Sequence, residues 1–150
     1  MNLLHLLFGL QGRIGRGQFW LSVLIYIVFL VVVIGLTTIA TGSLTAVFGA
    51  ALLAYIPVLI SGIFVGIKRL HDRNKSGWWL LVFYGIPVAL QLVVPVVGGD
   101  GETESMSIAI LQYVGLAVSL WGLVELGFIR GTIGGNPYGP DPVAPKPAKH

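Results

Sequence analysis

Four long apolar segments, separated by short polar or charged ones, constrain this chain more than any other feature of its sequence. The first runs from residue 19 to residue 40 without a charged side chain. A helix of this length, rising about 1.5 Å per residue, spans roughly 33 Å and matches the hydrocarbon core of a bilayer. The pattern therefore predicts a transmembrane helix over residues 19–40.

Three further segments repeat this pattern, over residues 44–67, 78–97 and 108–129. Hydrophobic residues make up 55% of the chain and charged residues only 10%, so a water-soluble fold would leave large apolar faces uncovered. We therefore expect an all-α fold, an integral membrane four-helix bundle formed by residues 1–142.

All nine lysines and arginines fall on one side of the predicted helices. They are Arg13, Arg16, Lys68, Arg69, Arg73, Lys75, Arg130, Lys146 and Lys149. The other side carries an uncharged turn at 41–43 and the acidic segment 100–105. Because basic residues favour the cytoplasmic side of a membrane, the pattern places both termini and the loop 68–77 in the cytoplasm. Their position beside apolar segments also argues against a nucleic-acid partner.

The two ends of the chain carry shorter segments with patterns of their own. Residues 1–10 are apolar but lack the basic start and the small-residue cleavage site of a signal peptide. We expect them to form a short amphipathic helix on the cytoplasmic surface. Proline recurs near the other end, and residues 143–150 are expected to be disordered.

Three polar segments on the predicted cytoplasmic side carry motifs. They read GRIGRGQFW at 12–20, KRLHDRNKSGWW at 68–79 and GNPYGPDP at 135–142. In this order, and interleaved with four apolar segments, they resemble the motifs of the family called domain of unknown function 805. The resemblance covers nearly the whole chain. It implies a small bacterial inner-membrane protein, and it implies no particular activity because none is assigned to the family.

The three motif segments are expected to meet in a cytoplasmic cap that binds anions. The candidate residues are Arg13, Arg16, Arg69, His71, Asp72, Arg73, Asn136, Tyr138 and Asp141. Guanidinium groups bind phosphate oxygens, and a basic residue near the membrane gains about 1 kcal/mol from its negative surface potential. Anionic phospholipid is therefore the expected ligand, with Asp141 pairing an arginine and Tyr138 covering apolar surface. The alternative, which we favour over a dedicated ligand site, is that the basic residues fix the topology and touch lipid without a pocket.

Asp72 has two interpretations, because a carboxylate among basic residues is not needed for the topology. As a structural group it would pair with Arg13, with Arg16 or with backbone amides, and tie two segments together. As a catalytic group it would orient His71 as a general base, but sequence neighbours rarely face each other and no nucleophile accompanies them. We favour the structural interpretation.

Glu125 is the one charged residue inside a predicted membrane helix. It lies roughly 7.5 Å inside the helix end, where an unpaired carboxylate is costly. We expect it to reach the interface or to pair with a basic residue such as Lys68 or Arg130. The alternative is a proton or cation relay, which would require a homo-oligomer to form a pathway.

No metal and no cofactor is expected. The chain has no cysteine, and its three histidines, at positions 5, 71 and 150, are scattered. The glycines around Arg13 lack the G-K-[ST] ending of a phosphate loop, so nucleotide hydrolysis is disfavoured.

These observations favour a non-enzymatic binding or scaffolding module whose cytoplasmic cap contacts anionic lipid or a membrane-protein partner. A small oligomeric transporter or channel that uses Glu125 is the second hypothesis. A membrane enzyme that uses His71 and Asp72 is the third.

Overall fold

The computed structural model describes residues 2–98 and 106–144, and every regular element in these two ranges is helical. In chain order the elements are α1 (Leu3–Phe8), α2 (Arg16–Thr41), α3 (Leu44–Asp72), the π-helical turn η1 (Leu81–Gly85), α4 (Ile86–Gly98), α5 (Met106–Leu123) and the π-helical turn η2 (Val124–Phe128). The acidic segment 100–105 lies outside the described residues. So does most of the segment 143–150, for which disorder was predicted.

Three of the described helices are long and apolar enough to cross a membrane. They comprise Arg16–Thr41, Leu44–Asp72 and Ile108–Phe128, and a fourth apolar helix, Leu81–Val93, is shorter. All four predicted apolar segments are thus helical. The chain is a multi-pass membrane protein by the length and composition of these helices.

The boundaries of α3 differ from the prediction at one end only. The helix begins at Leu44 as predicted, and the Ser43 hydroxyl caps it by accepting a hydrogen bond from the Ala46 amide at 3.4 Å. It then continues through the basic run to Asp72, so residues 68–72, which were expected in a loop, are helical. This continuation places Arg69 and Asp72 one turn apart on the same helix face.

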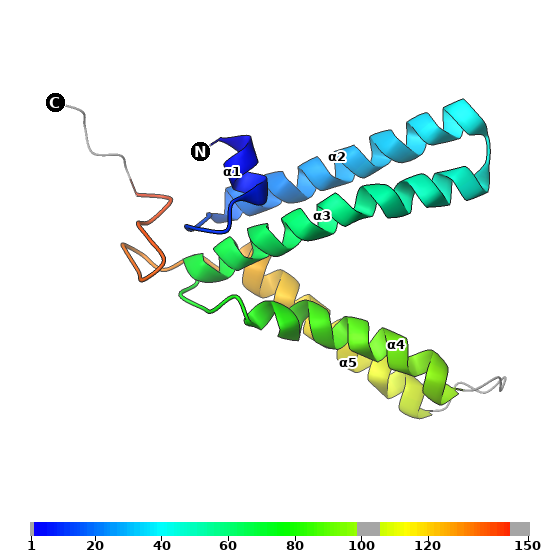
Figure 1. Ribbon diagram of the computed structural model, residues 1–150. Coiled ribbons are helices and arrows are strands. Elements are labelled where there is room, and N and C mark those ends of the chain that lie inside the picture. Colours follow the sequence, from blue (N-terminus) through cyan, green and yellow to red (C-terminus); the bar gives the residue numbers. More distant parts are fainter. Residues whose placement is uncertain (1, 99–105, 145–150) are drawn as a thin grey trace.

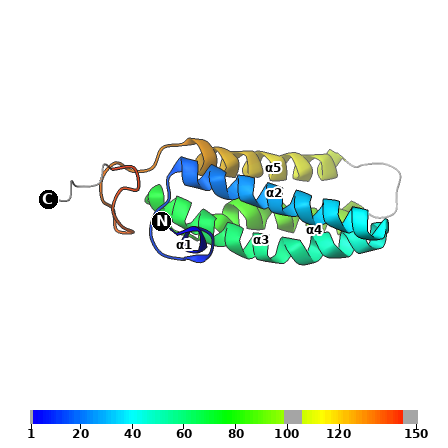
Figure 2. The ribbon, with the colours of Figure 1, turned by 90° about the horizontal axis from the view of Figure 1, so that it is seen from above.

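The long helices form two hairpins, α2 with α3 and α4 with α5 (Figures 1 and 2). The hairpins meet near the end of α3 and diverge toward their turns, so the described chain has the shape of a V (Figure 1). The expected four-helix bundle is therefore seen only in part, at the apex of the V. Apolar helix faces can diverge in a bilayer because lipid tails are as apolar as the faces themselves.

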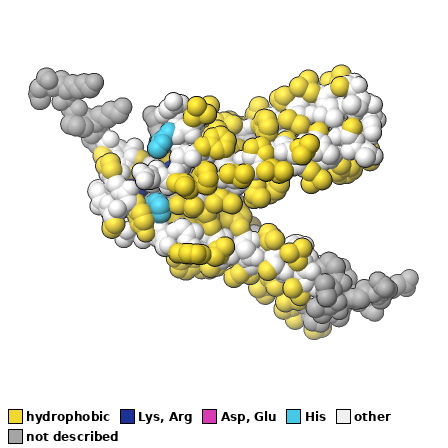
Figure 3. Space-filling view, in the orientation of Figure 1, with side chains coloured by type: hydrophobic (Ala, Val, Ile, Leu, Met, Phe, Trp, Pro, Cys, Tyr) yellow, Lys and Arg dark blue, Asp and Glu magenta, His cyan; other side chains and the backbone are white. Residues whose placement is uncertain are grey.

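The buried apolar core lies at this apex. Its members are Leu6, Ile14, Phe19, Val65, Leu70, Leu80, Phe83 and Leu126. Farther along the arms, large apolar side chains point outward, as at Ile39, which is 86% exposed (Figure 3). An outward apolar surface of this kind is what a lipid environment requires.

Glycines allow the close packing at the apex. A Cβ atom on Gly66 would lie 2.8 Å from the Leu80 side chain, and one on Gly127 would lie 2.9 Å from the Trp20 ring. A Cβ atom on Gly122 would lie 2.8 Å from Phe83. Small residues at such crossings let helix backbones approach, which is the usual basis of helix association in membranes.

The N-terminal helix α1, expected to lie on the cytoplasmic surface, packs against the first hairpin. Lys68, which is fully buried, donates hydrogen bonds from Nζ to the carbonyls of His5, at 2.8 Å, and Leu6. The Ser61 hydroxyl donates to the carbonyl of Leu7 at 2.7 Å. The last carbonyls of a helix lack hydrogen-bond donors within that helix. For α1, the side chains of Lys68 and Ser61 on α3 are such donors.

Candidate functional site

The three motif segments come together at the apex and form a polar cap, defined here as residues 12–16, 68–75 and 125–141. The cap contains every charged residue that the structure describes, seven basic and three acidic. They are Arg13, Arg16, Lys68, Arg69, Arg73, Lys75, Arg130, Asp72, Glu125 and Asp141. The cap therefore carries a surplus of positive charge at one end of the molecule.

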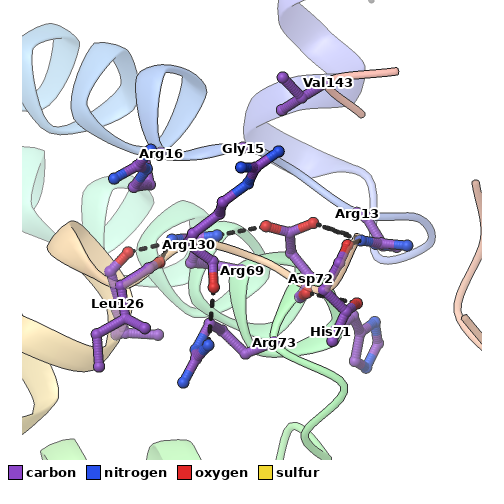
Figure 4. A network of polar contacts seen from close by, with 12 residues as sticks. Arg13, Gly15, Arg16, Arg69, His71, Asp72, Arg73, Leu126, Arg130 and Val143 are labelled. Carbon is purple, nitrogen blue, oxygen red and sulfur yellow. Dashed lines mark hydrogen bonds and ion pairs between the residues drawn. The ribbon is translucent and has the colours of Figure 1, made fainter. Parts of the chain in front are cut away.

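Asp72 is the centre of the cap and is only 2% exposed. Its Oδ1 accepts a hydrogen bond from Arg13 Nε at 3.1 Å, and its Oδ2 pairs with Arg69 Nη1 (Figure 4). The pairing with Arg13 that the structural interpretation of Asp72 predicted is present. A buried carboxylate needs such partners, because an unpaired charge loses its hydration without compensation.

The segment that follows η2 closes over Asp72. The Asp72 carbonyl accepts hydrogen bonds from the Thr132 amide at 2.8 Å and from the Thr132 hydroxyl at 3.1 Å. A Cβ atom on Gly131 would lie 2.0 Å from Asp72 Oδ2, so only glycine can occupy this position beside the carboxylate. The sequence alone did not single out Gly131.

Arg13 joins the N-terminal segment to the C-terminal one. Its Nη1 donates to the carbonyls of Gly134 at 2.7 Å and Gly139 at 3.1 Å, and its Nη2 donates to the carbonyl of Thr132 at 2.6 Å. Together with the bond to Asp72, these contacts engage all three guanidinium nitrogens. Arg13 is 6% exposed and has no donor directed at solvent.

Arg69 plays the corresponding role for the second hairpin. Its Nε donates to the Leu126 carbonyl at 2.7 Å, and its Nη2 donates to the Ile129 carbonyl. These carbonyls lie in and just after η2, where the helix no longer supplies partners. Because Arg69 is fully buried, it holds the end of the α4–α5 hairpin on α3 and cannot reach an outside ligand.

His71 and Asp72 face different partners. The ring of His71 stacks on Tyr138 with centroids 3.9 Å apart and planes inclined by 7°. The Asn136 side-chain amide donates to the His71 carbonyl at 2.9 Å. The Tyr138 ring, which was expected to cover apolar surface, stacks on an imidazole. His71 is not paired with the carboxylate that a catalytic dyad requires.

Asp141 was expected to pair with an arginine. It instead closes the turn at the end of the cap. Its carboxylate accepts hydrogen bonds from the amides of Val143 at 2.9 Å and Gly134 at 3.1 Å. These bonds to the backbone favour the ionised form and lower the pKa of Asp141 below its ordinary value.

Glu125 is buried and paired, but with other residues than those expected. Its Oε1 accepts from Arg73 Nε at 3.0 Å and from Lys75 Nζ at 2.9 Å. Lys68 is engaged by α1 and the Arg130 side chain does not reach the carboxylate. A carboxylate that holds two cations is already neutralised. This agrees with the expectation that Glu125 pairs with basic residues and not with the alternative of a relay.

Arg16 and Arg130 differ from the other arginines because they are exposed. Both border a cavity of about 100 Å³ on the cap surface. It is lined by Gly15, Arg16, Asp72, Arg130, Gly131, Asp141 and Val143. Arg16 Nη1 donates to the Phe128 carbonyl at 3.2 Å, and neither arginine is joined to Asp72 (Figure 4). Arg16 was a predicted site residue, whereas Arg130 was considered only for the topology and as a possible partner of Glu125.

Within the described residues, histidine and carboxylate side chains do not gather in groups of three or more that could hold a metal ion. The polar cap is therefore characterised by its guanidinium groups and by backbone carbonyls, and the chemistry open to its surface is anion binding.

Comparisons with known proteins agree with the motifs. Residues 7–140 match the family described as "Protein of unknown function (DUF805)", a range that includes all or most of each motif segment. The chain is 28% identical to "Uncharacterized protein YiiR" of Escherichia coli K12 over 141 residues, which cover 94% of this chain and 90% of the relative. It is 31% identical to "Inner membrane protein YhaH" of the same organism over 107 residues, 64% of this chain and 83% of the relative. No solved structure gives a significant match. The chain belongs to the DUF805 family.

Proposed function

We propose that this protein is a non-enzymatic binding module of the bacterial inner membrane, and that the surface of its polar cap binds the phosphate of an anionic phospholipid through Arg16 and Arg130. The membrane assignment draws on the apolar helices and on the similarity to an inner membrane protein of Escherichia coli. Both termini and the polar cap lie in the cytoplasm, because the basic residues are gathered at that end.

The observation that carries the proposal is the division of the arginines into two groups. Arg13 and Arg69 are buried, and backbone carbonyls and Asp72 take up their donors. Arg16 and Arg130 are exposed beside one cavity, and the one side-chain hydrogen bond found for the pair among the described residues is that of Arg16 Nη1 to the Phe128 carbonyl. Asp141 borders the same cavity, but its carboxylate accepts from the amides of Gly134 and Val143. Paired guanidinium groups at a membrane surface suit a phosphate, which accepts several charge-assisted hydrogen bonds.

A non-enzymatic role follows from the partners of the two groups that would otherwise be catalytic. Asp72 is occupied by two arginines, and His71 is covered by Tyr138. Neither is positioned to take a proton from the other. The same reasoning weakens a transport role for Glu125, whose carboxylate is held by Arg73 and Lys75.

The proposal is tested by measuring the phospholipid that stays with the purified protein. The double variant Arg16→Gln, Arg130→Gln removes both exposed guanidinium groups and leaves the buried ones in place. At about 1 kcal/mol for each basic residue, its affinity for phosphatidylglycerol falls by roughly 30-fold. Native mass spectrometry after detergent extraction measures the bound fraction.

A matched control separates a site from a general charge effect. Lys146→Gln with Lys149→Gln lowers the net charge by the same amount. This control variant retains phosphatidylglycerol at the wild-type level. Equal retention by both double variants would show that the lipid responds only to net charge, and the proposed site would be rejected.

A further inference from the structure

The two hairpins enclose a space, called the wedge here, that the predicted four-helix bundle does not contain. It opens from the apex toward the hairpin turns, and the space-filling view shows it as a deep notch between the arms (Figure 3). Two cavities of about 370 Å³ and 260 Å³ lie in it near the apex, and both are bordered by Phe19 and Tyr84. The larger one falls within the usual range of ligand pockets, about 300–1,000 Å³.

The walls of the wedge are apolar on both sides. Val58 and Ile63 of the first hairpin border the smaller cavity, and Val88 and Leu123 of the second border the larger one. Because each hairpin contains at least one helix long and apolar enough to cross a membrane, the wedge lies at the depth of lipid tails. An apolar space at that depth favours an apolar occupant, since no water is present to hydrate it.

The closed end of the wedge, at the apex, adjoins the exposed arginines of the polar cap. Arg16 precedes Phe19 by three residues on α2, a rise of about 4.5 Å along the helix. The next residue on α2, Trp20, contacts η2. Its indole donates to the Gly127 carbonyl at 3.0 Å, and its ring packs edge-on against Phe128. Amphipathic aromatic rings in this position are typical of the level where lipid headgroups meet tails.

Charge distinguishes between the two occupants that an apolar wedge could accept. A second copy of the chain in the same orientation would bring its own positively charged polar cap next to Arg16 and Arg130. A phospholipid brings a negative phosphate to the arginines and an apolar chain to the wedge. The positive charge beside the closed end of the wedge therefore favours the phospholipid.

We propose that one anionic phospholipid binds with its phosphate at Arg16 and Arg130 and with one acyl chain in the wedge between the hairpins. This inference rests on the proposed function and adds the part of the lipid that the polar cap does not touch. The protein then recognises a phosphate and a chain together, and a soluble phosphate compound without a chain binds less tightly than the lipid.

Photo-crosslinking of the full-length protein in nanodiscs tests this inference. The probe is phosphatidylglycerol with a diazirine in one acyl chain, and the modified residues are located by mass spectrometry. Adducts are expected on residues that line the larger cavity, such as Phe83, Tyr84, Val88, Ser119 and Leu123. The Arg16→Gln, Arg130→Gln variant shows at least tenfold fewer of these adducts. A phosphatidylcholine probe, which has no net charge, labels the outer faces of wild type and variant equally.

A wedge-filling variant separates the two proposals. Ser119 borders the larger cavity, and Ser119→Phe places a ring in it. The variant loses the wedge adducts, while its retention of phosphatidylglycerol still depends on Arg16 and Arg130. Adducts confined to the outer faces, or a cross-link from the wedge to a second copy, would overturn the wedge inference and leave the proposed function intact. Retention that does not depend on the two arginines would overturn the proposed function itself.

Discussion

The interior and the rim of the polar cap use the same side chain for opposite purposes. In the interior, Arg13 and Arg69 surround Asp72 and give their donors to it and to carbonyls of a distant segment. At the rim, Arg16 and Arg130 border a cavity with their guanidinium groups exposed. The difference teaches that arginines of one cap can differ in how many of their donors the fold has already satisfied, and only donors left over are open to a ligand.

The largest effect is expected from removing the negative charge of the interior. Asp72→Asn keeps the shape of the side chain but leaves two buried guanidinium groups without a counter-charge. The free energy of unfolding should fall by about 3–5 kcal/mol, measured by denaturant titration in detergent micelles. The rim variant Arg16→Gln, Arg130→Gln should change it by about 0.5 kcal/mol or less. A similar loss in both variants would erase the distinction between interior and rim.

The next effect concerns the space beside the same carboxylate. Gly131→Ala would place a Cβ atom 2.0 Å from Asp72 Oδ2 and force the two segments apart. Overpacking of this kind costs about 1–3 kcal/mol, to be read from the same titration. Gly135→Ala is the matched control, because no atom lies within 4 Å of its Cβ position. Equal stability of the two alanine variants would contradict the tight fit around Asp72.

A smaller effect is expected where the interior meets solvent. Tyr138→Leu removes the ring that stacks on His71 and should cost about 0.5–1.5 kcal/mol. Tyr138→Phe retains the ring and should retain most of the stability. Hydrogen exchange of residues 132–139 provides a local measure, with faster exchange in the leucine variant only. If the phenylalanine variant exchanged as fast, the hydroxyl and not the stack would be the stabilising group.

The smallest effect is a pH dependence at the edge of the rim. The folded state lowers the pKa of Asp141 below its ordinary value of 3.8, so its contribution to stability is present above pH 3.8 and is lost as the pH falls through the lower, folded pKa. Hydrogen-exchange protection of the Gly134 and Val143 amides should follow this loss. In Asp141→Asn, protection should be lower at neutral pH and should no longer change in the acidic range. The same acid profile in both proteins would assign the titration to another group.

The sequence was sufficient to predict the helices and the meeting of the three motif segments. Long uncharged segments leave few alternatives to membrane helices, and the start of α3 at Leu44 follows from the capping residue before it. The one-sided placement of basic residues brought Arg13 and Asp72 to the same end of the molecule, where they do pair. These features depend on composition and local order, which a sequence displays directly.

The partners of the charged residues could not be predicted in the same way. Arg69 binds the carbonyls of Leu126 and Ile129, and backbone carbonyls carry no sequence signature. Glu125 pairs with Arg73 and Lys75 because the turn after α3 folds across η2, a tertiary arrangement that residue spacing does not reveal. The V shape likewise cannot be predicted from the apolar pattern, which is the same in a closed bundle.

The engagement of Arg13 and Arg69 by late parts of the chain has a consequence for biosynthesis. Both arginines leave the ribosome well before the carbonyls of residues 126–139 that receive their donors. Until that segment has been synthesised, Asp72 is the only one of these partners that the two guanidinium groups can bind. The polar cap can therefore close only after the second hairpin has been made, and a chain interrupted earlier leaves both arginines without these backbone partners.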